Sequence, residues 1–251
     1  LSEVVPDFMK KYAGQGTDNL GSSDVEVPRI KLLQGLSPEL EDHEEAKLGH
    51  FWHSMANVSL GKEVTIIPVY IDKRAMLWRP RDDGGGILAR SDDCIHWSPP
   101  NASFKVMIGK KADRNQREVI WTTKPLVSAS GLLEWGSSDP SISDSQPAAT
   151  LMYNMVVALP DFPDLPPAVV TLQRASIKPA RKFLGKLKMA RAPSFGMKFT
   201  MKSFTDTNPN GEKFQQFVFD PDGFVTDETQ FKVYQDLYEA FKRLGLKVAD
   251  L

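Results

Sequence analysis

Cationic side chains accumulate between Thr171 and Ser203 without a single Asp or Glu. The whole chain has a formal charge of −1, so this excess of one sign is a local feature. Exposed faces normally mix Lys with Glu, and a merely solvated surface is therefore the less favoured interpretation. Clustered cations of this kind are typical of a surface that binds a polyanion, with nucleic acid as the first candidate. The cations of this basic segment (residues 171–203) are Arg174, Lys178, Arg181, Lys182, Lys186, Lys188, Arg191, Lys198 and Lys202.

Aromatic residues beside arginines give a second binding signal, in the stretch LWRPRDDGGGILARSDDCIHW (residues 77–97). Single-stranded nucleic acid is held by cations along its backbone and by rings stacked on its bases. The loop-like context of this stretch, next to three consecutive glycines, favours rings that are available for stacking. The further candidate binding residues are Trp78, Arg79, Arg81, Arg90 and Trp97.

Motifs for catalysis are missing from the sequence: it has no GxxxxGK[ST], GxGxxG, HExxH or GxSxG. His50 and His53 are three residues apart, but no third ligand has a defined spacing, so no metal site is predicted. The acids Asp82, Asp83, Asp92 and Asp93 could bind a divalent ion for a nuclease. Acids beside a triple glycine are more typical of turns and of ion pairs with nearby arginines. We therefore predict a protein that is not an enzyme and has no cofactor.

Composition places the chain among ordinary globular proteins, since 41% of its 251 residues are hydrophobic and 25% are charged. Cys94 is the single cysteine, which excludes an internal disulfide and fits a reducing, cytoplasmic location. No apolar run approaches a membrane span, and the N-terminal LSEVVPDFMKKY lacks the pattern of a secretory signal.

Two hydrophobic periods follow one another in the basic segment. From Ile177 to Met189 the apolar residues, including Phe183, recur with the period of a helix, and the cations cover the opposite half. From Phe195 to Lys202 the period becomes two, which predicts a strand. The aromatic side chains Phe183 and Phe195 lie on the apolar sides and are predicted to be core residues.

Gly185 lies on the cationic half of this predicted helix. A glycine inside a helix costs about 0.5–1 kcal/mol relative to alanine. Close approach of a phosphate backbone would explain the residue, and so would a helix that ends or kinks there. The sequence leaves both explanations open.

The rest of the chain predicts mainly strands. Apolar runs indicate strands at residues 64–71, 106–107, 118–122, 151–159, 168–172 and 213–219, with a hairpin tip at residues 84–86, a turn at DPDG (220–223) and a helix at 227–244. The fold class is therefore β-rich α+β, a barrel or sandwich with one inserted basic helix and a C-terminal helix. We expect a flexible lead-in over residues 1–27, one nucleic-acid-binding domain over 28–225, and a helix over 226–251 that packs on it.

The order of the strand AVVTL, the basic helix SIKPARKFLGKLK, the strand FGMKFTMKS and the turn NPNG resembles the single-stranded-DNA-binding proteins of tailed bacteriophages, which have an OB-fold. The segment LWRPRDDGGGILARSDD adds to the resemblance, which is one of pattern and covers roughly residues 28–245. It implies an elaborated, partly open OB-like barrel. Such proteins often carry an acidic C-terminal tail that recruits partners, and the ending RLGLKVADL departs from this.

The predicted function is sequence-independent binding of single-stranded DNA in phage DNA replication or recombination. The expected partners are single-stranded DNA, replication or recombination proteins, and further copies of the chain. Three alternatives stay open: a recombination protein that anneals complementary strands, a metal-dependent nuclease that uses the four acids, and a structural protein whose basic face meets an acidic partner.

Overall fold

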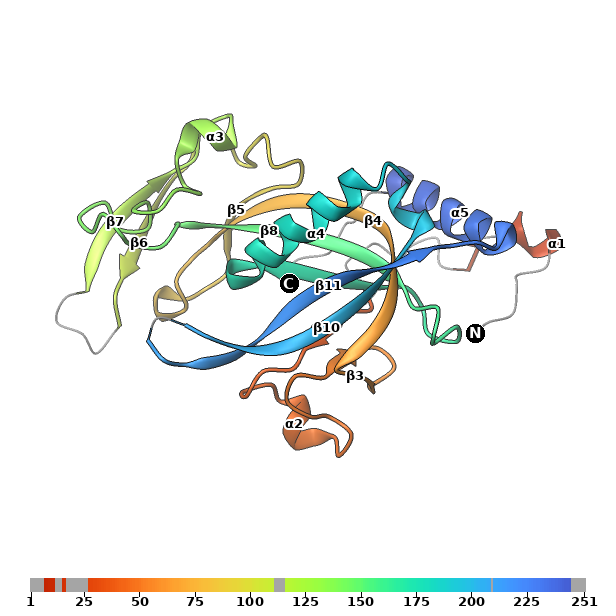
Figure 1. Ribbon diagram of the computed structural model, residues 1–251. Coiled ribbons are helices and arrows are strands. Elements are labelled where there is room, and N and C mark those ends of the chain that lie inside the picture. The colour runs from red at the N-terminus through yellow and green to blue at the C-terminus, as the bar shows by residue number, and fades with distance from the viewer. Residues whose placement is uncertain (1–6, 12–14, 17–26, 111–115, 209, 245–251) are drawn as a thin grey trace. The chain divides into compact units, whose positions relative to one another are not determined.

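The computed structural model describes residues 7–11, 15–16, 27–110, 116–208 and 210–244 (Figure 1). Most of the expected lead-in over residues 1–27 lies outside the described residues, which include the short helix α1 (Asp7–Lys10). The chain divides into two compact units, and the range 28–225 contributes to both. The first unit comprises Leu1–Ile71, Met155–Thr171 and Lys178–Leu251, and the second comprises Asp72–Asn154 and Leu172–Ile177.

A β-sheet forms the framework of the first unit. Its strands are β4 (Glu63–Trp78), β8 (Ala149–Ala158), β9 (Ala168–Gln173), β10 (Met197–Thr207) and β11 (Lys213–Phe224). Their order is β11-β10-β4-β8-β9, and β10 runs antiparallel to both of its neighbours. Because β11 and β9 stand at opposite ends of this order, the described strands form no closed barrel. The β-rich α+β class is confirmed, whereas the OB-type barrel stays a prediction.

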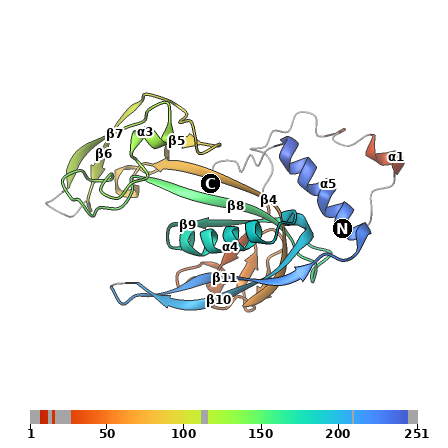
Figure 2. The ribbon, with the colours of Figure 1, turned by 45° about the horizontal axis from the view of Figure 1, so that its top comes forward.

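Helices α4 (Ile177–Met189) and α5 (Glu228–Leu244) cover opposite faces of this sheet (Figure 2). Phe183 of α4 contacts the rings of Phe199 and Phe219, with ring centroids 4.9 and 4.7 Å apart. Ile66 lies opposite Phe199 in the ladder, so the next residue of β4, Ile67, faces the other side. Ile67 belongs to the core cluster on which α5 packs. The prediction of an inserted helix and a C-terminal helix is confirmed.

Asp227 begins α5 as its N-cap. Its Oδ1 accepts hydrogen bonds from the backbone N–H groups of Thr229 and Gln230 at 2.7 and 3.0 Å. These bonds satisfy two of the amides that the first turn of a helix leaves without an intrahelical partner. The helix starts within one residue of its predicted position.

Pro68 lies in β4 just beyond the end of the ladder with β10, and its backbone nitrogen faces the β10 side, as the backbone of Lys62 does when its carbonyl accepts the N–H of Ser203. The ladder to β10 ends at Ile66, and the ladder to β5 (Ile87–Ser91) begins at Ala75. Proline is tolerated in a sheet only where its missing N–H has no ladder partner. The strand was predicted to end at Ile71, but it continues to Trp78.

The outer edge of β11 is covered by side chains. The amide of Gln34 bonds to both backbone groups of Gln215, donating from Nε2 to the carbonyl at 3.0 Å and accepting the N–H at Oε1 at 2.8 Å. Two residues further, the N–H of Phe217 donates to Oε1 of Gln216 at 3.0 Å, and the carbonyl of Phe219 accepts a bond from Lys186 Nζ. The next outward position is a proline, residue 221, which has no N–H. Between Gln215 and residue 221, each outward-facing residue of β11 therefore has at least one backbone group capped by a side chain or, at the proline, lacks a donor.

The predicted DPDG turn at residues 220–223 is wrong, because β11 runs through it to Phe224. The ladder continues from Thr200 opposite Asp220 to Met197 opposite Phe224, across a bulge. A proline on the outer edge breaks no ladder bond, so the turn-like composition did not end the strand.

Three further strands of the first unit form a small antiparallel sheet. They are β1 (Ile30–Leu32), β2 (Phe51–His53) and β3 (Val58–Gly61), in the order β1-β2-β3. The short helix α2 (Glu39–Asp42) follows β1. Ile30 and Leu33 are buried, whereas Leu36 is exposed.

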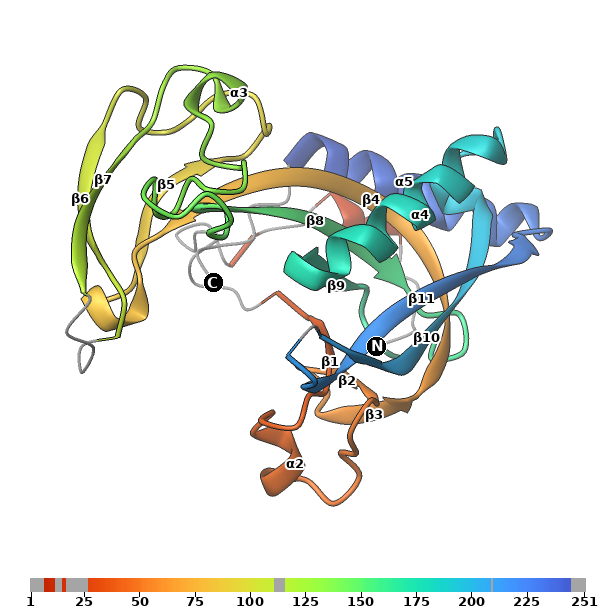
Figure 3. The same ribbon diagram turned by 60° about the vertical axis from the view of Figure 1, so that its left-hand side comes forward.

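The second unit contains the hairpin β6 (Ser103–Ile108) and β7 (Arg117–Thr122), the pairing of β5 with the end of β4, and the helix α3 (Val127–Ser130) (Figure 3). A 3₁₀ turn over Arg81–Asp83 and three glycines with positive φ connect β4 to β5. The predicted hairpin tip at residues 84–86 is therefore confirmed. Trp97, Trp121 and Leu132 belong to the core of this unit.

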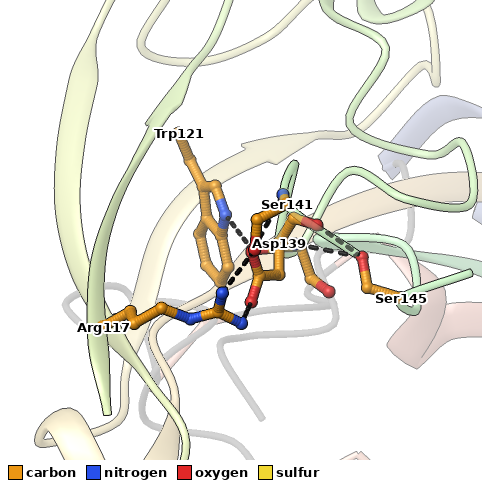
Figure 4. Close-up of polar contacts among 6 residues, drawn as sticks. Arg117, Trp121, Asp139, Ser141 and Ser145 are labelled. Atoms are coloured by element: carbon orange, nitrogen blue, oxygen red, sulfur yellow. Dashed lines mark hydrogen bonds and ion pairs between the residues drawn. The ribbon is translucent and has the colours of Figure 1, made fainter. Parts of the chain in front are cut away.

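A polar network fastens the loop after residue 137 to β7 (Figure 4). The guanidinium of Arg117 is paired with the carboxylate of Asp139, whose side chain is only 4% exposed. Oδ1 of Asp139 accepts bonds from the backbone N–H of Ser141 at 3.1 Å and from its hydroxyl at 2.7 Å. The indole of Trp121 donates to the Ser138 carbonyl at 3.1 Å. A single carboxylate thus organises a loop that has no regular secondary structure.

Candidate nucleic-acid interface

The predicted binding residues divide between the two units. Lys178, Arg181, Lys182, Lys186, Lys188, Arg191, Lys198 and Lys202 belong to the first unit. Arg174, Trp78, Arg79, Arg81, Arg90 and Trp97 belong to the second unit. Each set is a surface of its own unit and is described separately.

Five cations line the outer side of α4 and the turn that follows it. Their side chains are exposed, and within the described part of the chain none of them forms an ion pair. The helix contains no acidic residue. We call this surface the basic ridge, and it consists of Lys178, Arg181, Lys182, Lys188 and Arg191. The predicted basic face of the helix is therefore present, and it is uncompensated.

Lys186 and Lys202 are not part of this uncompensated surface. Nζ of Lys186 lies 3.3 Å from Oδ1 of Asp220, and Nζ of Lys202 lies 3.5 Å from Oε1 of Glu63 and 4.0 Å from Oδ2 of Asp220. The expectation that nothing offsets the cations of residues 171–203 is wrong at these two positions. The acids come from β4 and β11, which are distant in sequence.

The cations of β10 face away from the basic ridge. Met197, Phe199 and Met201 are buried on the side of the sheet that α4 covers, so Lys198 and Lys202 point to the other side. The alternation predicted for this strand is confirmed. The basic ridge and Lys198 therefore lie on opposite faces of the sheet, and the cations of the helix and the strand come together where Lys186 and Lys202 share the carboxylate of Asp220.

Gly185 lies within α4, which continues unbroken to Met189. The helix therefore does not end at this glycine, which removes one of the two explanations offered by the sequence. A Cβ added to Gly185 would meet no other atom within 4 Å. No close contact within the described residues requires a glycine at this position.

Trp97 is a core residue of the second unit, which corrects its assignment as a stacking platform. Its side chain is buried, and its Nε1 donates to the hydroxyl of Ser130 at 3.0 Å. The partner is 33 residues away in sequence. Trp78 is half-buried at the end of β4, opposite Ile87.

The arginines near the glycine loop serve local ion pairs. Nη1 of Arg79 lies 3.2 Å from Oδ2 of Asp83, and Nε of Arg90 lies 3.6 Å from Oδ2 of Asp92. Arg81 is exposed in the 3₁₀ turn, and Arg174 is exposed with a positive φ of 52°. Arg79 and Arg90 thus stabilise the hairpin, as expected for acids beside a glycine turn.

The four acids of the nuclease alternative are not arranged as a metal site. Asp93 caps its own loop: its Oδ1 accepts the N–H groups of Ile95 and His96 at 2.7 and 2.8 Å, and its Oδ2 lies 2.7 Å from Nδ1 of His96. The bond from the His96 amide is the main reason that the pKa of the Asp93 carboxyl lies well below its usual value. No group of three or more His, Cys, Asp or Glu side chains able to hold a metal occurs among the described residues.

Two exposed residues escaped the sequence analysis. Met189 is 77% exposed at the end of α4, beside the basic ridge, and Trp135 is 70% exposed in the second unit. Met189 is the last residue of the predicted helix, and its apolar type gave no sign of exposure. Trp135 has no cation next to it in sequence, so it does not belong to the pattern of rings beside arginines.

Comparisons with known proteins identify a family. No helix in the described ranges is long and apolar enough to cross a membrane. No curated protein and no solved structure matches the chain significantly. The family model described as "Pam3 phage gp34-like protein" matches residues 2–247. Since this match covers almost the whole chain, the protein belongs to the Pam3 phage gp34-like family, a family of phage proteins.

Proposed function

We propose that the protein binds single-stranded DNA without sequence preference, as a non-enzymatic component of phage DNA replication or recombination in the host cytoplasm. The observation that carries the proposal is the basic ridge: five exposed cations, without an acid on the helix, on an element that Phe183 anchors in the core. The phage family agrees with this setting. The resemblance of residues 28–245 to OB-fold phage proteins that bind single strands supports the same proposal.

The chemistry of the basic ridge favours backbone recognition. Lysine and arginine contacts to phosphates position a protein on DNA but carry no sequence information. Helix α4 contains no Asn or Gln, the side chains that pair with adenine edges, so its polar contacts come from Lys and Arg alone. Binding through this ridge would therefore coat a strand and leave its bases accessible for copying or pairing.

A charge-matched pair of triple variants tests the proposal. The ridge variant is Lys178→Gln, Arg181→Gln and Lys182→Gln, and the control variant is Lys232→Gln, Lys242→Gln and Arg243→Gln on α5. All six side chains are exposed, and both variants lose three charges. Affinity for a fluorescein-labelled oligo-dT is measured by anisotropy at low salt. The ridge variant should bind at least about tenfold more weakly, and the control should bind nearly as well as the wild type.

Two outcomes would overturn the proposal. One is a wild-type protein that binds no single-stranded DNA at low salt. The other is an equal loss of affinity in both triple variants, which would mean that overall charge and not the ridge is responsible. Parallel titrations with single-stranded RNA, duplex DNA and polyglutamate show which polyanion the ridge prefers. Tighter binding of polyglutamate than of DNA would favour an acidic protein partner.

A further inference from the structure

Gly185 stands in the middle of the basic ridge. At about 100° per residue, it lies some 40° around the helix from Arg181, 60° from Lys182 and Lys188, and 20° from Lys178. The cations Arg181 and Lys188 flank it on one side, and Lys178 and Lys182 flank it on the other. The only residue without a side chain in α4 is therefore the one that four cations surround.

The described fold gives no reason for a glycine at this position. Its backbone does not adopt the left-handed conformation, and a Cβ would project into open space. The helix is continuous on both sides of it. Glycine weakens a helix interior relative to alanine, because it restricts the unfolded chain less. Gly185 thus lowers the stability of α4 without serving the packing of the protein.

We propose that Gly185 is the point at which the sugar–phosphate backbone of the bound strand touches the main chain of α4. This inference rests on the proposed function and specifies its geometry. Without a Cβ, the phosphodiester can lie directly on the helix surface, between the cations on either side. The shorter distance strengthens each charge interaction, and the Cα hydrogens add weak C–H···O contacts. The strand then runs along the helix axis, with Gly185 as the floor of the contact.

The variant Gly185→Ala tests this geometry, because the fold and the binding surface should respond in opposite directions. The added methyl group has room, so the melting temperature should rise by a few degrees. Affinity for oligo-dT should fall by about threefold or more, because the strand is held away from the cations. The bulkier, uncharged Gly185→Gln should weaken binding further. The control is Gly35→Ala, since Gly35 is exposed, has no unusual φ and has equally open space around it.

Each result separates this inference from the proposed function. Unchanged or tighter binding by Gly185→Ala would overturn the inference, while a loss of affinity in the ridge triple variant would still uphold the proposed function. A lower melting temperature in Gly185→Ala would also overturn it, because the glycine would then serve the fold. Absence of binding by the wild type would overturn the proposed function itself. Weaker binding by Gly35→Ala to the same degree would show that the effect does not belong to the ridge.

Discussion

Asp72 in β4 is a mostly buried carboxylate beside an arginine. Nε of Arg74 lies 2.9 Å from its Oδ2, and the two side chains are 12% and 11% exposed. Burial raises the pKa of the Asp72 carboxyl above its ordinary value, although the charge of Arg74 opposes the shift. The native protein thus binds the proton of Asp72 more tightly than the unfolded chain does.

The pH dependence of stability follows from this raised pKa. The contribution of Asp72 is fully present below the unfolded value, near pH 3.8, and is lost as the pH rises through the native pKa. Asp72→Asn cannot titrate. Relative to the wild type, its free energy of unfolding should therefore increase between pH 4 and pH 7. Urea unfolding of both proteins at the two pH values measures the difference, and a constant difference would contradict the assignment.

Removing Arg74, the partner of Asp72, should lower the free energy of unfolding at neutral pH. Arg74→Gln leaves a buried carboxylate without its cation, which typically costs about 3 kcal/mol. The same urea experiment at pH 7 should show this variant as the less stable of the two. Equal stability of Asp72→Asn and Arg74→Gln would mean that the ion pair is effectively solvated.

The burial and the ion pairing of single side chains were the properties that the sequence predicted least well. Trp97 looked like a surface ring because its neighbours in sequence are polar, but it hydrogen-bonds to Ser130, which is far along the chain. Lys186 of α4 was expected to be uncompensated, because its acidic partner, Asp220, belongs to β11 and is not near it in sequence. In both cases the interacting partner is distant in sequence, so it cannot be predicted from the neighbouring residues.

Among the elements, α4 buries two residues, Ala180 and Phe183, and only Phe183 has a large side chain. Phe183 is 2% exposed and contacts two further phenylalanines. Replacing a buried phenylalanine by alanine leaves a cavity and typically costs about 3–5 kcal/mol.

Phe183→Ala should therefore lower the free energy of unfolding by about 3 kcal/mol or more. Met189→Ala in the same helix is the matched control, because this side chain is 77% exposed and its loss should change stability by less than about 0.5 kcal/mol. Chemical unfolding followed by circular dichroism measures both. A small loss for Phe183→Ala would show that the helix is held in another way, and the positions of the basic ridge would then lack a rigid support.

Elements with a clear hydrophobic period were predicted well. The bounds of α4 agree with the prediction at both ends, and the buried alternation of β10 agrees in phase. Both patterns are read within a few turns or pleats, so local sequence contains the necessary information. The faces on which the two elements present their cations depend on the strand partners of β10. Local sequence does not specify those partners. For this reason the cations of α4 and β10, which were expected to form one basic surface, could not be assigned to their faces in advance.

Over the whole molecule, acidic and basic residues nearly cancel. The proposed binding of DNA would therefore depend on local contacts and not on long-range attraction. The basic ridge offers five cations. For binding to single-stranded DNA, each phosphate that is neutralised makes the slope of log affinity against log salt more negative by about 0.7. The slope should therefore be about −3.5. In the ridge triple variant, which lacks three of the cations, its magnitude should be smaller by about 2. Titrations with oligo-dT at several salt concentrations measure it. A slope near zero would exclude phosphate contacts as the source of affinity.

Closure of the sheet is the global property that the sequence could not predict. Strand number and alternation are local features, but a barrel requires a particular pairing between first and last strands. In the described chain β11 and β9 end the order without pairing to each other. The pattern of residues 28–245 is thus compatible with more than one way of arranging the same strands.

The capped edge of β11 has a consequence for how copies of this protein can meet. Open strand edges are templates on which another chain can add a strand, which leads to polymers or to exchange of segments. Along β11 both backbone groups of Gln215, the N–H of Phe217 and the carbonyl of Phe219 already bond to side chains, and the next outward position is a proline. A second copy of the chain would have to displace these side chains before it could continue the sheet through this edge. The capped edge therefore disfavours strand addition between neighbouring copies.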